Sequence, residues 1–265
     1  MPGPFEGTRV LLTGGSSGIG AGLAEALAAE GATVGIAARR HQRLAGVLER
    51  CRAHAPDSRM WTVDLADPAQ VDRLAHDALA ELGGVDLLVN NAGIPKRRHV
   101  SRLDAATVDE VMAINYRSPV RLTLALLPHM LERGSGRIVN ISSVAAPLSS
   151  PGEAAYDASK AALAVFSEAM AVDLWETGVK VTVVYPGVVD TELFTLPDND
   201  PFTGDVPAIT VNEAVHTILR GVTAGALSVY APEYLSEFAV QKAQDPESFL
   251  AGMAQYVRAR DQREP

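Results

Sequence analysis

Short apolar segments alternate with longer segments of mixed polarity along most of the chain. From Thr8 onward the apolar segments read TRVLLTGG, ATVGIAARR, SRMWTVDL, VDLLVNNAG, GRIVNISS and VKVTVVYPG. Their cores are almost continuously apolar, which is typical of strands that are covered on both faces of a parallel sheet. Segments of helical length and composition separate them. The alternation therefore predicts a doubly wound α/β fold with about seven parallel strands and helices on both faces of the sheet.

The ends of several helices can be predicted from the residues that favour them. Asp67 followed by Pro68 is a typical helix start, and Gly83 is a typical helix end. Another helix is expected to begin near Glu153 and to end at Gly178. Further helices are expected at 104–133, 211–222 and 233–260.

The chain 1–265 is expected to form a single domain. Its hydrophobic content of 47% is sufficient for one sizeable core, and the connections are too short for an interdomain linker. The segment 190–210 interrupts the regular alternation, because it contains three prolines and several residues that favour turns. An irregular segment of this length is typical of a lid or binding loop. We therefore expect this segment to contact the substrate.

Composition and charge narrow the range of partners and locations. A net charge of −9 argues against broad binding to nucleic acid or to anionic membranes. No apolar run approaches the roughly 20 residues that cross a bilayer, and the beginning of the chain lacks the basic start of a signal peptide. The expectation is a cytoplasmic protein that binds neither nucleic acid nor membranes.

Glycine and polar residues follow the apolar core of each expected strand. The carboxyl ends of parallel strands meet at one edge of the sheet, where such folds bind their ligands. The first of these motifs, TGGSSGIG at 13–20, lies between a strand and a helix. Its glycines permit a tight turn and let backbone amides approach a phosphate group. Because the glycines do not follow the common G-x-G-x-x-G spacing, a plain strand-to-helix turn is an alternative at this point.

The same motif also matches the nucleophile turn of a serine hydrolase through Gly14, Ser16 and Gly18. Asp190 and His216 follow in the chain order that such hydrolases use. That fold requires several strands before the nucleophile, whereas here the motif ends the first strand. His216 is also explained by an ordinary amphipathic helix, so the hydrolase is a minor alternative.

The second expected strand ends in a basic pair, Arg39 and Arg40. Enzymes that hold the free ribose hydroxyl of NAD usually place an acid about 20 residues after the glycine turn, whereas an arginine accommodates the 2′-phosphate of NADP. The pair therefore predicts a preference for NADP(H), with NAD possible. The alternative is that these arginines open a helix and point into solvent.

Tyr156 and Lys160 in YDASK stand four residues apart, so they project from the same face if this Ala-rich segment is helical. A phenol titrates near pH ~10, and a positive neighbour stabilises the phenolate. A unit charge about 4 Å away is worth about 4 kcal/mol at an effective dielectric near 20, or roughly three pKa units. A pair of ordinary surface residues is the alternative for the isolated motif.

The glycine turn, NNAG, IVNISS, YDASK and YPG occur in this order and at these separations in the short-chain dehydrogenase/reductase (SDR) family, which the chain resembles from about Thr8 to Thr191. The resemblance implies a Rossmann-type fold and hydride transfer, without a metal, between NAD(P) and a small-molecule carbonyl or secondary alcohol. Tyr156 matches the general acid/base. Lys160 matches the residue that lowers its pKa, Ser143 the residue that hydrogen-bonds the reacting oxygen, and Asn115 the helix asparagine whose carbonyl holds a water.

The resemblance also implies a set of cofactor-binding residues. Those expected around the adenosine, pyrophosphate and ribose are Gly14, Ser16, Ile19, Asp64, Asn91, Ala92 and Gly93, and those expected on the nicotinamide side are Pro186, Gly187 and Thr191. Tyr156 and Lys160 are also expected to contact the cofactor. The other expected cofactor-binding residues lie in or beside the same motifs: Ser17, Gly18, Gly20, Arg39, Arg40, Leu65 and Val189.

Two departures from the family pattern limit what the resemblance implies. Ser17 replaces the basic residue that many NADP-dependent members place in the glycine turn, and the chain lacks the Asp-Gly-Gly ending of many tetrameric relatives. A homodimer or homotetramer is expected, because the helices at 104–133 and 153–177 resemble those that pair relatives. A nucleotide-binding sensor without turnover is the non-enzymatic alternative.

Overall fold

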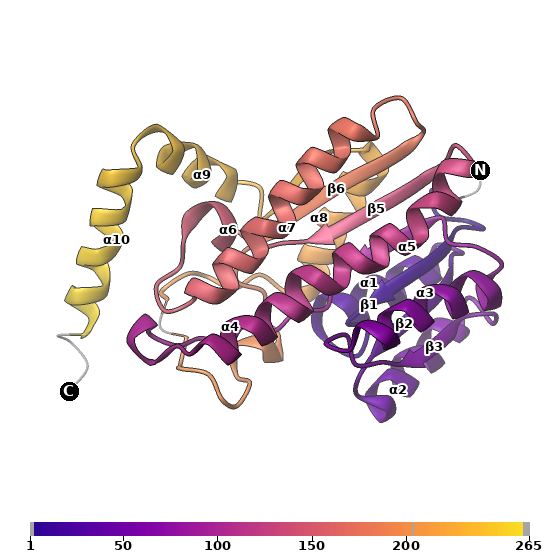
Figure 1. Cartoon of the computed structure of the whole chain (residues 1–265), viewed down its shortest axis with the longest axis horizontal. Coiled ribbons are helices and arrows are strands. Elements are labelled where there is room, and N and C mark those ends of the chain that lie inside the picture. The colour runs from indigo at the N-terminus through magenta and orange to yellow at the C-terminus, as the bar shows by residue number, and fades with distance from the viewer. Residues whose placement is uncertain (1–2, 203, 262–265) are drawn as a thin grey trace.

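One sheet of seven strands forms the centre of the computed structural model, which describes residues 3–202 and 204–261. Every strand pairing in this described part of the chain is parallel, and the order is β3-β2-β1-β4-β5-β6-β7 (Figure 1). The strands are β1 (Arg9–Thr13), β2 (Thr33–Ala38), β3 (Arg59–Thr62), β4 (Leu87–Asn90), β5 (Gly136–Ile141), β6 (Val179–Pro186) and β7 (Ser228–Ala231). The predicted doubly wound parallel sheet is confirmed.

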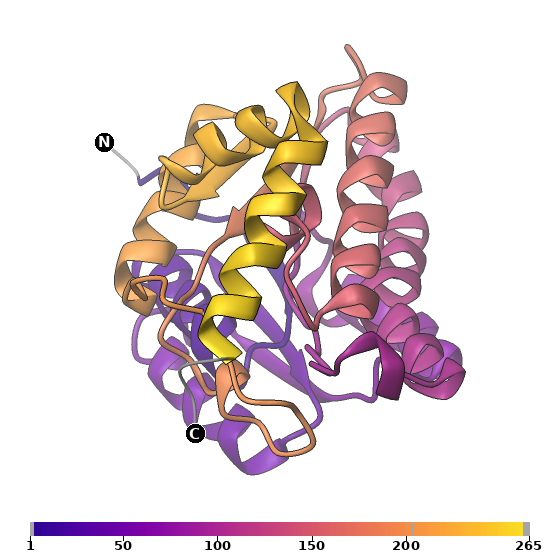
Figure 2. The same cartoon turned by 90° about the vertical axis from the view of Figure 1, so that its left-hand side faces the viewer.

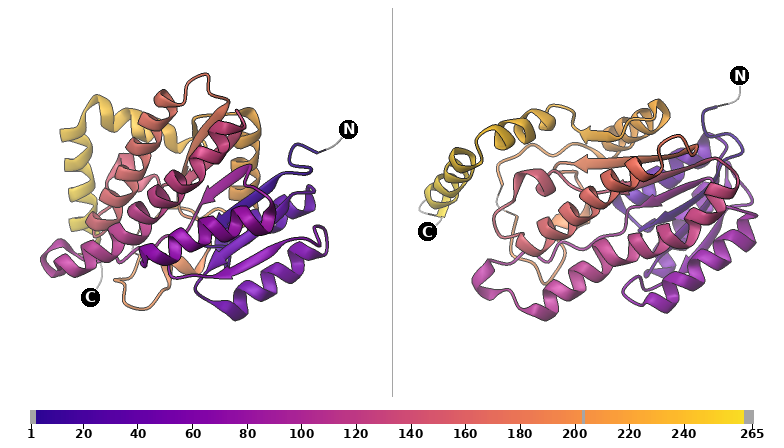
Figure 3. Two further views of the ribbon diagram at one scale, coloured as in Figure 1. Left: turned by 45° about the vertical axis from the view of Figure 1, so that its right-hand side comes forward. Right: turned by 45° about the horizontal axis from the view of Figure 1, so that its top comes forward.

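Helices cover both faces of the sheet (Figure 3). Three of them pack on one face, α1 (Gly18–Ala29), α2 (His41–Arg52) and α8 (Val211–Ala224). Three others pack on the opposite face, α3 (Pro68–Leu82), α5 (Ser118–Glu132) and α7 (Ala154–Asp173). In β1, Val10 and Leu12 belong to the first core and Leu11 to the second. Because alternate residues point to opposite faces, a strand buried on both sides is apolar throughout.

Shorter elements surround the carboxyl edge of the sheet. They are η1 (Val100–Arg102), α4 (Ala105–Met112), the π-helical turn η2 (Ala113–Arg117), α6 (Ala145–Leu148) and η3 (Glu192–Phe194). The expected helix at 104–133 is thus helical along its length but contains a π turn between α4 and α5. Such single turns are frequent at functional sites.

Several predicted helix ends are confirmed, and one is wrong. The Asp67 side chain accepts a hydrogen bond from the Ala69 N–H, and Gly83 ends α3 with a φ of 71°. In contrast, α7 ends at Asp173 and not at Gly178, because a tight turn follows in which the Thr177 N–H donates to the Leu174 carbonyl.

The expected single helix at 233–260 consists of two helices, α9 (Leu235–Gln244) and α10 (Pro246–Asp261). Asp245 between them has an extended backbone with φ of −145°, and Pro246 has no N–H to continue the hydrogen-bond ladder of α9. Proline instead favours the first turn of a new helix. As a result α10 turns away from α9 and runs along one side of the molecule (Figure 2).

Candidate active site

A cavity of about 880 Å³ lies at the carboxyl ends of the strands, where the strand order reverses between β1 and β4. This is the position at which doubly wound sheets bind their ligands. Nearly all of the residues predicted from the sequence line it: Gly14, Ser16, Ser17, Gly18, Ile19, Gly20, Arg39, Arg40, Asp64, Leu65, Asn91, Ala92, Gly93, Ser143, Tyr156, Lys160, Pro186, Gly187, Val189 and Thr191. The fold therefore brings the separate motifs together.

The glycine turn between β1 and α1 is packed too closely for side chains. A Cβ atom on Gly20 would lie 2.3 Å from the Gly14 carbonyl oxygen, and one on Gly14 would lie 2.7 Å from Asn91 Nδ2. The Asn91 amide donates to the Thr13 carbonyl at 3.0 Å, which fixes the NNAG segment against the turn. The turn leads directly into the amino terminus of α1, and its glycines let a ligand approach the backbone N–H groups. Such a turn fits the pyrophosphate of a dinucleotide.

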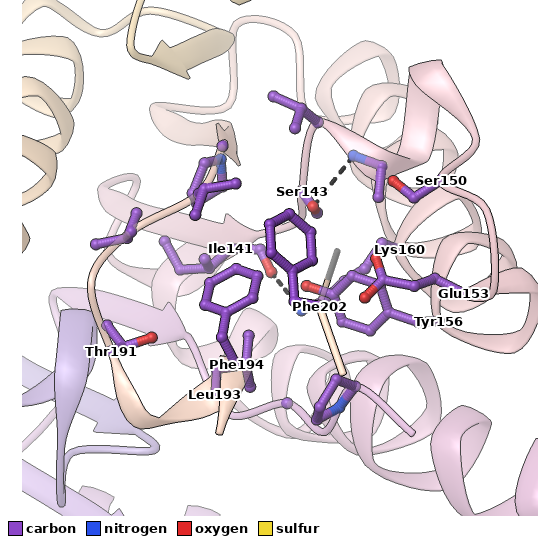
Figure 4. A pocket seen from close by; sticks show the side chains of 18 of the residues that line it. Ile141, Ser143, Ser150, Glu153, Tyr156, Lys160, Thr191, Leu193, Phe194 and Phe202 are labelled. Carbon is purple, nitrogen blue, oxygen red and sulfur yellow. Dashed lines mark hydrogen bonds between the residues drawn. The ribbon is translucent and has the colours of Figure 1, made fainter. Parts of the chain in front are cut away.

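Tyr156 and Lys160 lie on the same side of α7 and face the cavity (Figure 4). Lys160 Nζ is 5.7 Å from the centroid of the Tyr156 ring and donates a hydrogen bond of 2.8 Å to the Ile141 carbonyl. Ser143 follows β5 and lines the same cavity, and its Oγ accepts the Ala145 N–H. The phenol, the hydroxyl and the ammonium group thus share one pocket with the glycine turn.

Asn115 lies in the π turn η2 and is completely buried, and within the described part of the chain it does not line the cavity. Its Oδ1 accepts the Ile94 N–H at 2.9 Å, and its Nδ2 donates to the Ile94 carbonyl and to Ser159 Oγ. The Ser159 hydroxyl in turn donates to the Tyr156 carbonyl. Asn115 therefore joins the NNAG segment to the helix that carries the tyrosine.

The expectation that Lys160 lowers the pKa of Tyr156 does not hold for the chain by itself. Burial raises the pKa of Tyr156, as does the charge of Glu153, while a hydrogen bond with Ser143 acts in the opposite direction. Burial also lowers the pKa of Lys160 to about 8. The sequence indicates the attraction between the two groups, but it does not indicate their burial, which favours the uncharged form of each.

The hydrolase alternative is wrong, because its residues do not come together. Ser16 Oγ accepts a hydrogen bond of 3.1 Å from the Arg40 guanidinium. In the described part of the chain His216 is exposed on α8, and neither His216 nor Asp190 lines the cavity. His216 is therefore not placed to activate this serine.

Arg97 and Glu153 belong to none of the predicted site motifs, although both line the cavity. The Arg97 guanidinium is 3.5 Å from the Glu153 carboxylate, and both side chains are buried. It also lies 5.4 Å and 5.9 Å from the ring centroids of Phe194 and Phe202 and donates to the Phe194 carbonyl. Arg97 thus attaches the 190–210 segment to the cavity wall beside Tyr156.

Oppositely charged residues also hold this segment from outside. Lys96 and Arg98 pair with Asp198, and Arg102 pairs with Asp200. A signal for this contact exists in the sequence, since KRRHVSR at 96–102 is basic and DND at 198–200 is acidic, but the separation of about a hundred residues conceals it. Thr203 lies outside the described residues.

The outer wall of the cavity comes from the end of the chain. Phe249, Met253 and Val257 repeat every four residues on α10 and face the cavity, and α9 contributes Phe238. Residues four apart share one face of a helix. The pocket is thus apolar at the end that lies toward α10.

A family model described as short chain dehydrogenase matches residues 8–200 of the chain. The chain belongs to this family of oxidoreductases. A short chain dehydrogenase of Pseudocercospora fijiensis is 39% identical over 200 residues, which are 72% of this dehydrogenase and 62% of that protein. A fatty acyl-CoA reductase of Acinetobacter baylyi is 34% identical over 219 residues, 82% of this chain and 73% of that protein. The chain thus spans about two thirds of the length of these curated relatives.

Solved structures of short-chain dehydrogenases share the whole fold. One from Streptomyces avermitilis is 32% identical with a TM-score of 0.80, covering 95% of this chain and 97% of that chain. One from Burkholderia cenocepacia, in complex with NADP, is 31% identical with a TM-score of 0.79, covering 94% and 98%. One from Burkholderia phymatum, in complex with NAD, shares the fold at 23% identity and a TM-score of 0.84, covering 92% and 95%. The cofactors NADP and NAD are thus each bound by one of these structurally similar proteins.

Among the residues that the structure describes, no helix combines the length and the apolar character that crossing a bilayer requires.

Proposed function

We propose that this protein catalyses reversible hydride transfer between NADP(H) and a carbonyl or secondary alcohol substrate. The observation that carries the proposal is the shared cavity, in which Ser143, Tyr156 and Lys160 face the glycine turn at the reversal of the strand order. The nicotinamide ring supplies or accepts the hydride when the cofactor is bound. The protein positions the cofactor and the substrate, and it supplies or accepts the proton.

Tyr156 is the proposed proton donor and acceptor, and Ser143 the group that holds the reacting oxygen. Both hydroxyls line the cavity. Because burial favours the neutral phenol, Tyr156 is suited to donate a proton to a developing alkoxide. Lys160 would bind the nicotinamide ribose and add positive charge, and oxidised nicotinamide is itself cationic. In the direction of oxidation both charges would favour the phenolate.

The preference for NADP(H) is supported by the position of Arg40. Although Ser17 replaces a basic residue in the glycine turn, the Arg40 guanidinium reaches the turn from β2 and donates to Ser17 Oγ at 2.7 Å. A cation therefore stands at the turn in spite of the substitution. Arginine can bind a phosphate through two parallel hydrogen bonds.

The substrate is proposed to carry a long apolar body. The cavity extends from Tyr156 to α10 and is lined there by aromatic and aliphatic side chains. The fatty acyl-CoA reductase relative from Acinetobacter baylyi is consistent with an apolar substrate. Apolar area removed from water contributes about 25 cal/mol per Å². The apolar wall near α10 would therefore favour substrates with a longer hydrocarbon chain.

A homodimer is proposed through α5 and α7. Apolar side chains that are 41% to 78% exposed lie along these helices and just after α7: Leu124, Leu131, Val165, Val172 and Trp175. Within each helix the aliphatic pair is seven residues apart, which places both side chains on one face. An exposed apolar stripe of this kind is typical of a protein interface.

The catalytic proposal is tested by replacing Tyr156 with Phe. Because only the hydroxyl is lost, NADPH binding measured by fluorescence is expected to stay within twofold of wild type. Turnover with a panel of ketones and aldehydes is expected to fall by about 10²- to 10⁴-fold, the usual contribution of a general acid/base.

Tyr185→Phe is the matched control, because this buried phenol on β6 contacts Glu168 and Tyr230. Its turnover should remain close to wild type. Full turnover by the Tyr156→Phe protein would refute the assignment, and NADPH binding without turnover by the wild type across the panel would favour the sensor.

A further inference from the structure

Glu192 lines the cavity and contacts the glycine turn, to which we assign the binding of the cofactor phosphates. It begins η3, directly after Thr191, on the segment that follows β6. Its carboxylate pairs with the guanidinium groups of both Arg40 and Arg43 and accepts a hydrogen bond of 2.7 Å from Ser17 Oγ. One acidic side chain thus joins the 190–210 segment to the glycine turn and to the start of α2.

This arrangement neutralises the positive charge at the phosphate position. Arg40 also donates to Ser16 and Ser17, so its guanidinium is held at the glycine turn. The hydrogen bond from Arg40, with further bonds from Ser17 and Arg43, lowers the pKa of Glu192 to about 2. The carboxylate is therefore ionised at any pH used for assays.

The contact is also open to solvent. The side chains of Arg40, Arg43 and Glu192 are 41%, 56% and 31% exposed, so none is held in place by complete burial. Exposed ion pairs contribute little to stability and exchange with solvent or with other ions. A ligand that carries a phosphate can accordingly take over the two arginines.

We propose that Glu192 is an intramolecular competitor for the 2′-phosphate of NADP(H). In the cofactor-free protein its carboxylate occupies Arg40 and Arg43, and the 2′-phosphate must displace it to bind. This inference rests on the proposed use of a nicotinamide dinucleotide. It assigns Glu192 a role in discriminating NADP(H) from NAD(H), because only the former carries the competing group.

The competition also connects the two ends of the cavity. Phe194 lies two residues beyond Glu192, its carbonyl accepts a hydrogen bond from Arg97, and its ring lies 4.9 Å from that of Phe202. Both rings line the substrate side of the cavity (Figure 4). Displacement of Glu192 by the cofactor would therefore act on the segment that carries Phe194, at the other end of the cavity.

The test compares Glu192→Gln with wild type by equilibrium titration of intrinsic fluorescence at low salt. The ligands are NADPH, NADH and adenosine 2′,5′-bisphosphate, which carries the 2′-phosphate without nicotinamide. The Kd for NADPH and for the bisphosphate is expected to fall between about threefold and thirtyfold in the variant, since two exposed ion pairs no longer compete. The Kd for NADH is expected to change less than twofold. Added NaCl should narrow the difference for NADPH, because salt screens the exposed charges.

Glu25→Gln is the matched control, since Glu25 pairs with Arg50 at similar exposure and does not line the cavity among the described residues. Its Kd values should equal those of wild type. Glu192→Ala should reproduce the result of Glu192→Gln, which separates the loss of charge from hydrogen bonds of the new amide.

Three outcomes would overturn the proposal: unchanged affinity in both Glu192 variants, weaker NADPH binding, or equal tightening for NADPH and NADH. The last outcome would place the competition at the pyrophosphate. Each of these results leaves the proposed hydride transfer intact, whereas a wild-type protein that binds neither dinucleotide would refute the proposed function itself.

Discussion

Asp157 follows the proposed general acid/base directly and is buried to the same extent. Its Oδ2 accepts the Ser150 N–H at 2.5 Å, while Oδ1 has no hydrogen-bond partner among residues 3–202 and 204–261. Burial raises the pKa of Asp157 to about 8, the charge of Glu153 acts in the same direction, and Lys242 acts against it. The folded protein therefore favours the neutral acid.

This pKa shift predicts a pH-dependent stability. Between the ordinary pKa of 3.8 and the folded value of about 8, the folded state holds a proton that the unfolded state has lost, so the free energy of unfolding falls as pH rises. Asp157→Asn removes this dependence. The Tm of the variant minus that of wild type is expected to increase by at least about 4 °C between pH 5 and pH 8, measured by calorimetry.

Asp173→Asn serves as the control for Asp157→Asn, because Asp173 is exposed at the end of the same helix. The difference in Tm between Asp173→Asn and wild type should not change with pH. If the Tm difference between Asp157→Asn and wild type were also independent of pH, the buried carboxyl group would already be ionised in the folded protein at pH 5.

At the scale of elements, α10 is expected to determine which substrates fit. Met253 lies at the middle of its cavity-facing row, so Met253→Trp fills the apolar end of the pocket. Catalytic efficiency is expected to fall about tenfold or more for a ten-carbon ketone and to change less than twofold for a four-carbon ketone, because one lost buried methylene already costs about 0.8 kcal/mol. Steady-state kinetics over a chain-length series measures this effect.

Ala254→Trp provides the comparison for Met253→Trp, because Ala254 is the next residue on α10 and is exposed. It adds the same ring on the outer surface and should leave the chain-length profile unchanged. An equal loss for all chain lengths in Met253→Trp would show that α10 does not contact the substrate.

The elements predicted correctly are those whose signals are local. The strands were recognisable because burial on both faces requires apolar residues at nearly every position, and α3 because Asp67 and Gly83 mark its ends. The turn after Asp173 and the break at Asp245 depend on tertiary packing and on one proline. The four residues that follow Asp173 include neither glycine nor proline, and near Asp245 only Pro246 indicates a helix end.

The site was predictable to the extent that its motifs follow the strands. Tyr156, Lys160 and Ser143 reach one cavity because parallel strands end at one edge. In contrast, the contacts of Arg97 with Phe194 and of Arg40 with Glu192 join segments about 100 and 150 residues apart. No periodicity within either segment specifies the partner. Burial of the tyrosine, which reverses the expected direction of its pKa shift, also requires the folded structure.

At the scale of the whole molecule, the apolar stripe on α5 and α7 is expected to form the dimer interface. Val172→Glu combined with Trp175→Glu places two charges at sites that are 72% and 78% exposed in the single chain. Because these positions are exposed, the fold should tolerate the change, whereas a buried interface would not accommodate unpaired charges. Light scattering after size exclusion is expected to report about 28 kDa for the variant and about twice that mass for wild type.

Val240→Glu is the control for the interface, because Val240 is an exposed valine on α9. It should retain the wild-type mass. A wild-type protein that elutes as a monomer at every concentration would refute the proposed dimer.

Because of the break between α9 and α10, the part of the chain that lines the far wall of the cavity can change independently of the part that carries the reacting groups. The reacting groups depend on β5, α7 and the glycine turn, whereas the far wall depends on a helix that begins anew at Pro246. Exchanging the terminal helix for one with smaller or larger side chains can therefore retune substrate scope while the chemistry is inherited unchanged. A library confined to Phe249, Met253 and Val257 would explore that scope at little risk to folding.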